Sequence, residues 1–360
     1  MTGRPRPALD DLPAYKPGRS IEEALAEHGI TSAVKLASNE LPFGPLPSVA
    51  GAISSGIERL HLYADTRASV LRSAIAEHHG VDEAQVTVAN GSVTLLQRLS
   101  LSYVDAGEQI AMCWPSFEAY PMFAALVGAE QVRVPLVDER FDLDALADAV
   151  TDRTKLVMIA NPNNPTGTTV PTSAIAAFCR RVPSGCLVVL DEAYAEFVTD
   201  PEVTDPRPLL EEFDHLVVTR TFSKAHGLAG LRAGYALGHP EVIGMLDRTQ
   251  VPFAVNELAQ RAAVASLGAI DEMQARVDAV VAERNRVVAV LSDRGWQLPD
   301  TQANFVWLPL GERSGEVGAQ LESTGVITRV FPGMGIRVTI GDAAMNDRLL
   351  AALADIGPVS

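Results

Sequence analysis

Short apolar runs alternate with amphipathic stretches through the first two thirds of the chain, and this alternation constrains the fold more than any other feature. Strands that alternate with helices are typical of a mostly parallel sheet with helices on both faces. Seven strands are predicted, at Gln85–Ala89, Gln109–Cys113, Gln131–Pro135, Lys155–Ala160, Cys186–Leu190, His215–Arg220 and Ala233–Leu237. The amphipathic stretches between them predict helices that include Ser92–Tyr103, Ser116–Val127 and Pro171–Val182.

The pattern changes near Val255, where one long helical stretch, Glu257–Arg294, precedes a smaller α+β unit. The strands predicted for this unit are Ala303–Pro309, Gly325–Arg329 and Gly335–Ile340. A chain of 360 residues exceeds the size at which one core usually stops growing, so we expect more than one domain. The predicted parts are an N-terminal arm (1–34), a large domain (35–254) and a small C-terminal domain (255–360). We expect the arm to pack on the small domain or on a partner subunit.

Composition and charge exclude several classes of protein. The net charge of −16 opposes binding to nucleic acid or to anionic membranes. The segment Met1–Arg19 has no apolar core of a signal peptide, and no apolar run reaches membrane-spanning length. Cys113, Cys179 and Cys186 match no metal-ligand spacing and are typical of reduced thiols. We therefore expect a cytoplasmic protein with no metal site.

Four polar motifs follow predicted strands, at the sheet edge where parallel sheets bind ligands. They are Asn-Pro-Asn-Asn-Pro-Thr-Gly (161–167), Asp-Glu-Ala-Tyr (191–194), Thr-Phe-Ser-Lys (221–224) with a continuation to Arg232, and Asn-Gly-Ser (90–92). Each motif alone has a structural explanation, because such residues also form turns and helix caps and a Ser-Lys pair occurs by chance.

Together the motifs meet the needs of one cofactor, pyridoxal 5′-phosphate (PLP). Lys224 can hold the PLP aldehyde as a Schiff base, and Asp191 can keep the pyridine nitrogen protonated. Asn164 and Tyr194 can hydrogen-bond the phenolic oxygen. The phosphate would be held at a predicted helix start, by Gly91, Ser92 and Val93, and by Thr221, Ser223 and Arg232 of the motif that follows the strand His215–Arg220.

In order and spacing, these motifs resemble the signature of fold-type I PLP-dependent aminotransferases. Within them the chain resembles the histidinol-phosphate aminotransferase group, from Tyr15 to Arg337. The resemblance implies the PLP-dependent transferase fold, like that of aspartate aminotransferase, with a mostly parallel seven-stranded sheet and a smaller α+β domain. It also implies a ping-pong reaction in which Lys224 is both the Schiff-base anchor and the group that moves the substrate proton.

The resemblance implies further site residues. Arg337 corresponds to the arginine that grips the substrate α-carboxylate, and Phe117 to the aromatic that stacks on the cofactor ring. Tyr63 corresponds to a tyrosine that reaches the phosphate from the other subunit, which implies a homodimer with composite active sites. The residues implied near the substrate side chain are Tyr15, Asn39 and Arg329. The chain departs from the family at Ala64, where proline is common, and at His226, where tyrosine is common.

The substrate follows from two further stretches. Residues 36–47 and 303–310 resemble the actinobacterial aromatic-amino-acid (phenylalanine) aminotransferase branch, which implies phenylalanine or tyrosine with the 2-oxoglutarate/glutamate couple. The first alternative is a histidinol-phosphate aminotransferase acting on imidazole acetol phosphate and glutamate, since Arg329 can hold a phosphate or a carboxylate. The second alternative is a PLP decarboxylase or lyase, which a grip of Arg337 on the carboxylate disfavours. The acidic charge argues against a DNA-binding regulator. The lack of a Gly-x-Gly-x-x-Gly motif after an early strand argues against a nicotinamide dehydrogenase.

Overall fold

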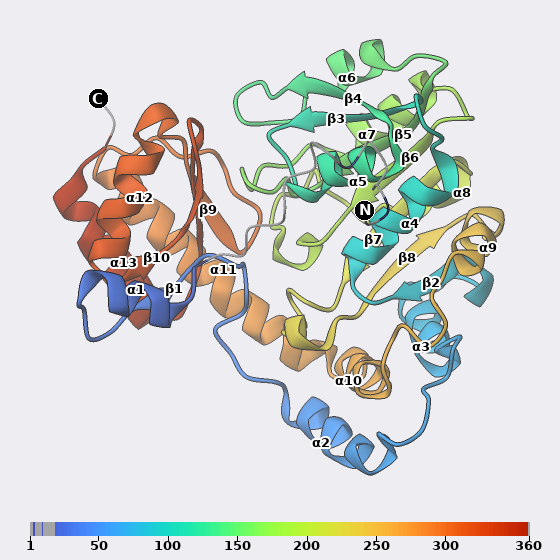
Figure 1. Ribbon diagram of the computed structural model, residues 1–360, viewed down its shortest axis with the longest axis horizontal. Coiled ribbons are helices and arrows are strands. Elements are labelled where there is room, and N and C mark those ends of the chain that lie inside the picture. Colours follow the sequence, from blue (N-terminus) through green and yellow to red (C-terminus); the bar gives the residue numbers. More distant parts are fainter. Residues whose placement is uncertain (1–2, 4–8, 10–18, 359–360) are drawn as a thin grey trace.

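The computed structural model describes residues 3, 9 and 19–358, which form two lobes (Figure 1). The larger lobe is built on a seven-stranded sheet in the order β2-β8-β7-β6-β5-β3-β4, in which β8 runs antiparallel to both neighbours and the other pairs are parallel. Its strands are β2 (Val86–Ala89), β3 (Gln109–Trp114), β4 (Glu130–Pro135), β5 (Thr154–Ala160), β6 (Leu187–Asp191), β7 (Leu216–Thr221) and β8 (Gly234–Gly238). This confirms the mostly parallel sheet, and each strand begins or ends within one residue of its predicted bounds.

Helices cover the sheet because its central strands are apolar on both faces. Every residue of β6 is buried, and Val188 and Val217 are fully inaccessible to solvent. The helices of this lobe are α2 (Pro47–Gly56), α3 (Ser69–His79), α4 (Ser92–Tyr103), α5 (Ala119–Val127), α6 (Leu143–Ala149), α7 (Thr172–Arg181), α8 (Arg207–Glu212), α9 (Pro240–Arg248) and α10 (Glu257–Leu267). Single 3₁₀ turns lie at Ile57–Arg59, Glu83–Gln85, Ala195–Phe197, Ala229–Leu231 and Gly311–Arg313.

The smaller lobe contains an antiparallel sheet, β11-β12-β9, and a short parallel pair, β1-β10. Its strands are β1 (Val34–Lys35), β9 (Phe305–Leu308), β10 (Val326–Ile327), β11 (Arg329–Phe331) and β12 (Gly335–Thr339), and its helices are α1 (Ile21–His28), α11 (Ile270–Asp293), α12 (Ser314–Ser323) and α13 (Ala343–Ile356). Ser20 and Glu23 form a capping box that starts α1. Because α1 contacts α12 and β1 pairs with β10, the chain from residue 19 to 35 lies against this lobe.

Two element predictions were wrong. The stretch Glu257–Arg294 is two helices rather than one, because Gly268 and Ala269 interrupt it and Ala269 (φ −125°, ψ 40°) leaves helical geometry. The stretch Gly325–Arg329 is not one strand, because its residues pair with different partners. Val326 lies in β10 beside β1, whereas Arg329 begins β11 beside β12.

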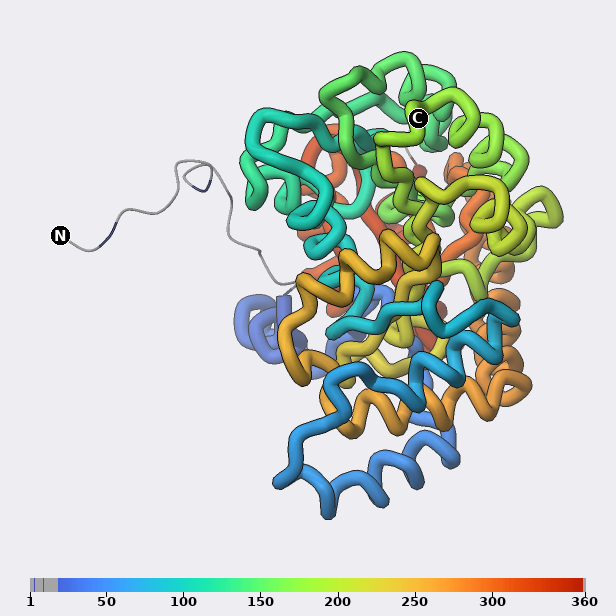
Figure 2. Tube along the Cα trace, turned by 90° about the vertical axis from the view of Figure 1, so that its right-hand side faces the viewer, coloured from blue at the N-terminus to red at the C-terminus, as the bar shows by residue number. Residues whose placement is uncertain are grey.

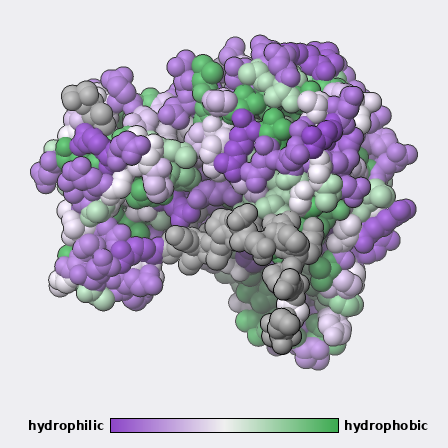
Figure 3. Space-filling view, turned by 45° about the horizontal axis from the view of Figure 1, so that its top comes forward, coloured by the Kyte–Doolittle hydropathy of each residue, from purple (hydrophilic) through white to green (hydrophobic). Residues whose placement is uncertain are grey.

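The lobes are joined through the long helix α11, which runs from the small lobe toward α10 (Figure 1). Helix α10 packs against α2 and α3, so segments that are far apart in the sequence lie side by side (Figure 2). Hydrophilic residues are spread over both lobes on the face drawn in Figure 3. In the part of the chain that the structure describes, no helix is long and apolar enough to cross a bilayer.

Candidate active site

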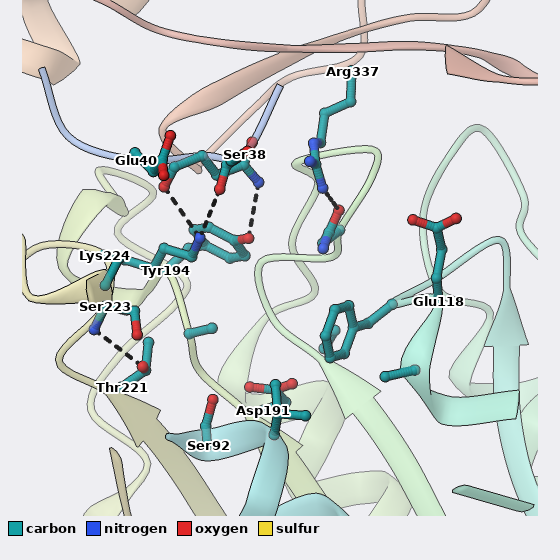
Figure 4. Close-up of a pocket in the computed structure, with 18 of the residues that line it drawn as sticks. Ser38, Glu40, Ser92, Glu118, Asp191, Tyr194, Thr221, Ser223, Lys224 and Arg337 are labelled. Carbon is teal, nitrogen blue, oxygen red and sulfur yellow. Dashed lines mark hydrogen bonds between the residues drawn. The ribbon is translucent and has the colours of Figure 1, made fainter. Parts of the chain in front are cut away.

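A cavity of about 530 Å³ is lined by residues of both lobes (Figure 4). It lies where β5, β6 and β7 end, because parallel strands bring the loops that follow them to one edge of the sheet. The predicted residues that line it are Asn39, Ser92, Val93, Phe117, Asn164, Asp191, Tyr194, Thr221, Ser223, Lys224, Arg232, Arg329 and Arg337. The structure therefore brings together motifs that are far apart in the sequence.

Asp191 is the last residue of β6 and is only 6% exposed. Its carboxylate accepts hydrogen bonds from the hydroxyls of Tyr120 (2.9 Å) and Thr219 (3.4 Å). Burial raises the pKa of Asp191 to about 6, although these hydroxyls lower it in part. A buried carboxylate held by neutral hydroxyls suits a positively charged atom of a ligand.

Lys224 follows β7 and reaches the cavity from the side opposite Glu118 (Figure 4). Its Nζ donates to the backbone carbonyls of Ser38 and Asn39, each at 3.1 Å. Burial and the positive charges of Arg337 and Arg232 lower the pKa of Lys224 to about 7. A large fraction of the amine is therefore neutral near pH 7, as a nucleophile or a general base must be.

The first turn of α4 and the loop after β7 form a cluster that suits an anion. Gly91 precedes α4 with φ +86°, and a Cβ at this position would lie 2.5 Å from Nη2 of Arg232. Only glycine lets the guanidinium come this close to the helix start. Arg232 donates to Ser223 Oγ at 3.2 Å. Ser223 N donates to Thr221 Oγ1 at 3.1 Å (Figure 4). Hydroxyls, a cation and a helix N-terminus together are the surroundings that phosphate groups prefer.

Arg337, on β12, connects the small lobe to the cavity. Its Nη1 donates to Asn164 Oδ1 and its Nη2 donates to the carbonyl of Ala37, each at 2.6 Å. Asn39 donates to the hydroxyl of Tyr194 at 2.9 Å. Asn39 also has φ +55°, a left-handed conformation that asparagine adopts more readily than most other residues with a side chain.

Arg329 lies on β11, directly opposite Arg337 on β12. Its Nη2 donates to both carboxylate oxygens of Glu118, at 2.9 and 2.8 Å. Glu118 immediately precedes α5 in the large lobe, so this ion pair joins the two lobes.

Two predicted site residues, Gly91 and Tyr63, lie away from the cavity lining, as does His226, where the chain departs from the family, and one predicted residue falls outside the described residues. Gly91 lies behind Arg232, as described above. Tyr63 is 85% exposed and stacks on Phe253 with 4.5 Å between ring centroids. His226 is buried, and its Nδ1 is 2.7 Å from Ser266 Oγ. Burial lowers the pKa of His226 to about 3, which favours the neutral ring. Tyr15 lies outside the residues that the structure describes.

Sequence reasoning missed several residues that face the site. Tyr120 holds Asp191, and the cavity is also lined by Glu40, Glu118, Met122 and Phe123. Glu118 and Met122 are one helical turn apart within the predicted helix Ser116–Val127, so their common side was readable from the spacing. Nothing in the sequence showed that this side faces the cavity.

Comparison with known proteins places these observations in one family. The sequence profile of the family "aminotransferase class I and II" matches residues 31–353. The chain is 49% identical to an aromatic amino acid aminotransferase of Thermobifida fusca, over 96% of this chain and 95% of that protein. It is 48% identical to the aromatic amino acid aminotransferase of Streptomyces avermitilis, over 96% of this chain and 95% of that protein. Among solved structures, the histidinol-phosphate aminotransferase of Sinorhizobium meliloti in complex with PLP is 30% identical, with a TM-score of 0.90 over 99% of this chain and 98% of that one.

Proposed function

The chain belongs to the class I and II aminotransferases, and from this premise we propose that it moves an amino group between an aromatic amino acid and 2-oxoglutarate. It is an aminotransferase, and its cofactor is PLP. The observation that carries the proposal is the cavity, in which a lysine with a lowered pKa, a buried carboxylate and an anion-binding helix start meet two arginines of the small lobe.

The residues present fit PLP. Arg232 fills the space beside Gly91 at the start of α4, and together with Thr221 and Ser223 this arrangement suits the phosphate. Asp191 suits the protonated pyridine nitrogen. The remaining proposed contacts are Phe117 to the ring, Asn164 and Tyr194 to the phenolic oxygen, and Ser92 and Val93 in the first turn of α4.

Once bound, PLP supplies an electron sink for the pair of electrons left when the substrate Cα loses its proton. The amine of Lys224, with its pKa near 7, can take that proton and give it back. Arg337 is buried, and the hydrogen bonds to Asn164 and Ala37 fix its guanidinium, so it can hold the substrate α-carboxylate in one orientation. A carboxylate held in this way is retained through the reaction, which argues against a decarboxylase.

Two observations support an aromatic substrate. The relatives named aromatic amino acid aminotransferases are 46–49% identical over nearly the whole chain. In addition, Phe117, Ala119, Met122 and Phe123 give the cavity an apolar wall. Histidinol phosphate remains the second candidate, because the S. meliloti enzyme has the same fold at 30% identity and Arg329 can also hold a phosphate.

The deciding measurement is kcat/KM of the holoenzyme for phenylpyruvate and for imidazole acetol phosphate, each with glutamate as amino donor. We expect phenylpyruvate to be preferred by at least tenfold, because burying its apolar phenyl ring against the apolar wall is more favourable than burying a polar imidazole ring there. A preference for the imidazole substrate would contradict the aromatic assignment. Lys224→Ala serves as the negative control, and it should lack both turnover and the visible absorption of lysine-bound cofactor.

We also propose a homodimer located in the cytoplasm. Seven of the twelve large apolar side chains that are exposed among the described residues lie in two segments, with Ile57, Leu60, Leu62, Tyr63 and Val70 in one and Val251 and Phe253 in the other. Exposed apolar surface of this kind is typical of interfaces, and Tyr63 is the residue proposed to reach the partner's phosphate site. The cysteines Cys113, Cys179 and Cys186 are buried free thiols, which supports a reducing compartment.

A further inference from the structure

Arg329 and Arg337 place two positive charges at directly opposed positions of β11 and β12, and both line the cavity. Like charges in opposed positions destabilise a sheet, so a carboxylate near them is stabilising. Arg337 is the residue proposed above for the substrate α-carboxylate. Arg329 lines the same cavity and can meet a second anionic group, such as the distal carboxylate of 2-oxoglutarate.

Glu118 provides a carboxylate to Arg329 from the protein itself. Both of its oxygens accept a hydrogen bond from Arg329 Nη2, at 2.9 and 2.8 Å. Its carboxylate stands on the side of the cavity opposite Lys224 (Figure 4). A distal carboxylate that reaches Arg329 must therefore compete with Glu118.

The pair between Glu118 and Arg329 is exposed enough to be replaced. The side chain of Glu118 is 42% exposed and that of Arg329 is 21% exposed. Ion pairs in contact with solvent contribute little to stability, so exchanging one carboxylate for another costs little. Ala119, Met122 and Phe123 of α5, the helix that Glu118 precedes, line the cavity with apolar groups. A ring bound against them benefits if the neighbouring guanidinium stays neutralised, because an uncompensated charge beside apolar groups is costly.

We propose that Glu118 is a specificity-determining residue that lets one site accept both an aromatic and a dicarboxylate substrate. With an aromatic substrate, Glu118 stays on Arg329 and neutralises it. With 2-oxoglutarate or glutamate, the distal carboxylate replaces Glu118 on Arg329. The inference rests on the proposed function, because it concerns the two substrates of that reaction.

The test measures dissociation constants of the holoenzyme for two unreactive probes, glutarate and 3-phenylpropionate, by calorimetry. Glu118→Gln keeps the shape of the side chain and removes its charge. We expect the Kd of glutarate to fall about two- to fivefold relative to the Kd of 3-phenylpropionate. This is the size of the effect that losing a competing, solvent-exposed ion pair can have on a binding constant. An unchanged ratio of the two constants overturns the proposal.

Two further variants separate competition at Arg329 from a general effect of charge. Glu212→Gln is the matched control, because Glu212 is 46% exposed, pairs with Arg180 at 2.8 Å and does not line the cavity. We expect no change in the ratio for this variant, and a change as large as that of Glu118→Gln overturns the proposal. In an Arg329→Gln background, adding Glu118→Gln should not shift the ratio. A shift that persists there also overturns it.

The binding ratio is independent of turnover. If wild-type holoenzyme fails to use phenylpyruvate, the proposed function fails whatever the ratio. If it uses phenylpyruvate and Glu118→Gln leaves the ratio unchanged, only the role of Glu118 is refuted.

Discussion

At the scale of single residues, the site combines groups that are costly to bury with partners that reduce the cost. Asp191 is held by the hydroxyl of Tyr120, a residue 71 positions away in the sequence, and Lys224 by the carbonyls of Ser38 and Asn39. Burial moves the two pKa values in opposite directions, up to about 6 for Asp191 and down to about 7 for Lys224. In both cases burial disfavours the charged form of the side chain. A positively charged ligand group beside Asp191 restores a favourable interaction for its carboxylate and is therefore bound more tightly than a neutral group.

Asp191→Asn should therefore stabilise the cofactor-free protein at neutral pH while weakening cofactor binding. The pKa of Asp191 rises from 3.8 to about 6 on folding, so the stability that its proton contributes is fully present below about pH 4 and is lost as the pH rises through about 6. The variant does not titrate there, so its advantage should be near zero at about pH 4 and reach up to about 3 kcal/mol above about pH 6.5. Chemical denaturation across this pH range measures it.

The control for this prediction is Asp105→Asn, which changes an exposed aspartate. We expect it to alter the free energy of unfolding by less than about 0.5 kcal/mol at every pH. A difference between Asp191→Asn and wild type that does not vary with pH would contradict the explanation by burial.

At the scale of elements, the end of one strand and the start of the next helix carry most of the site. The first turn of α4 works as an anion site because Gly91 turns the chain with φ +86° and leaves room for Arg232. β8 also approaches closely, since a Cβ at Gly234 would lie 2.4 Å from Ser92 N. Strand, turn and helix therefore depend on two glycines that no other residue can replace without movement.

Gly91→Ala should raise the Kd for PLP by about tenfold. The new Cβ meets the far end of the flexible Arg232 side chain, which moves away from the helix start, and the backbone geometry also disfavours any side chain by about 1–3 kcal/mol. Titration of the cofactor-free protein with PLP measures the affinity, and thermal unfolding measures the strain. Gly51→Ala is the control, because Gly51 lies in α2 with open space around its Cβ position and should bind PLP normally. Unchanged affinity for PLP in Gly91→Ala would refute the proposal that Gly91 makes room for Arg232 at the phosphate site.

At the scale of the whole molecule, the active site is proposed to be complete only in the homodimer. Tyr63 is 85% exposed and does not line the cavity of its own chain, which fits a residue that acts in the partner's site. The segment after the arm and the small lobe also contribute to the cavity, through Asn39 and through Arg329 and Arg337. The boundary proposed near residue 255 lies just before α10, which packs against α2 and α3 of the large lobe.

Mixing two inactive variants tests the composite site. Subunits with Lys224→Ala lack the lysine, and subunits with Tyr63→Ala lack the tyrosine. In a mixed dimer one of the two sites receives an intact lysine and an intact tyrosine, so random mixing of equal amounts should restore about a quarter of wild-type activity. Sedimentation of each variant alone checks that the dimer is intact. Activity that equals the mean of the two parents would show that Tyr63 serves its own subunit or none.

The sequence by itself determined the strands of the main sheet and the motifs at their ends, because apolar periodicity and turn residues are local properties. Lys224, Asp191 and Asn164 were readable for this reason, since each lies at the end of a buried strand or in the loop after it. The break at Gly268 and the division after Ile327 were not readable, because local pattern is compatible with either outcome and packing decides.

Only the tertiary structure decided which side chains meet across the cavity. Glu118 and Arg329 are 211 residues apart and belong to different lobes, so their ion pair depends on how the lobes pack. The pKa values of Lys224 and Asp191 likewise depend on burial, which no local pattern specifies. The anion cluster beside Gly91 forms because β8 brings Arg232 back to the start of α4. The sequence thus determined the chemistry available to the site, and long-range packing determined its geometry and charge.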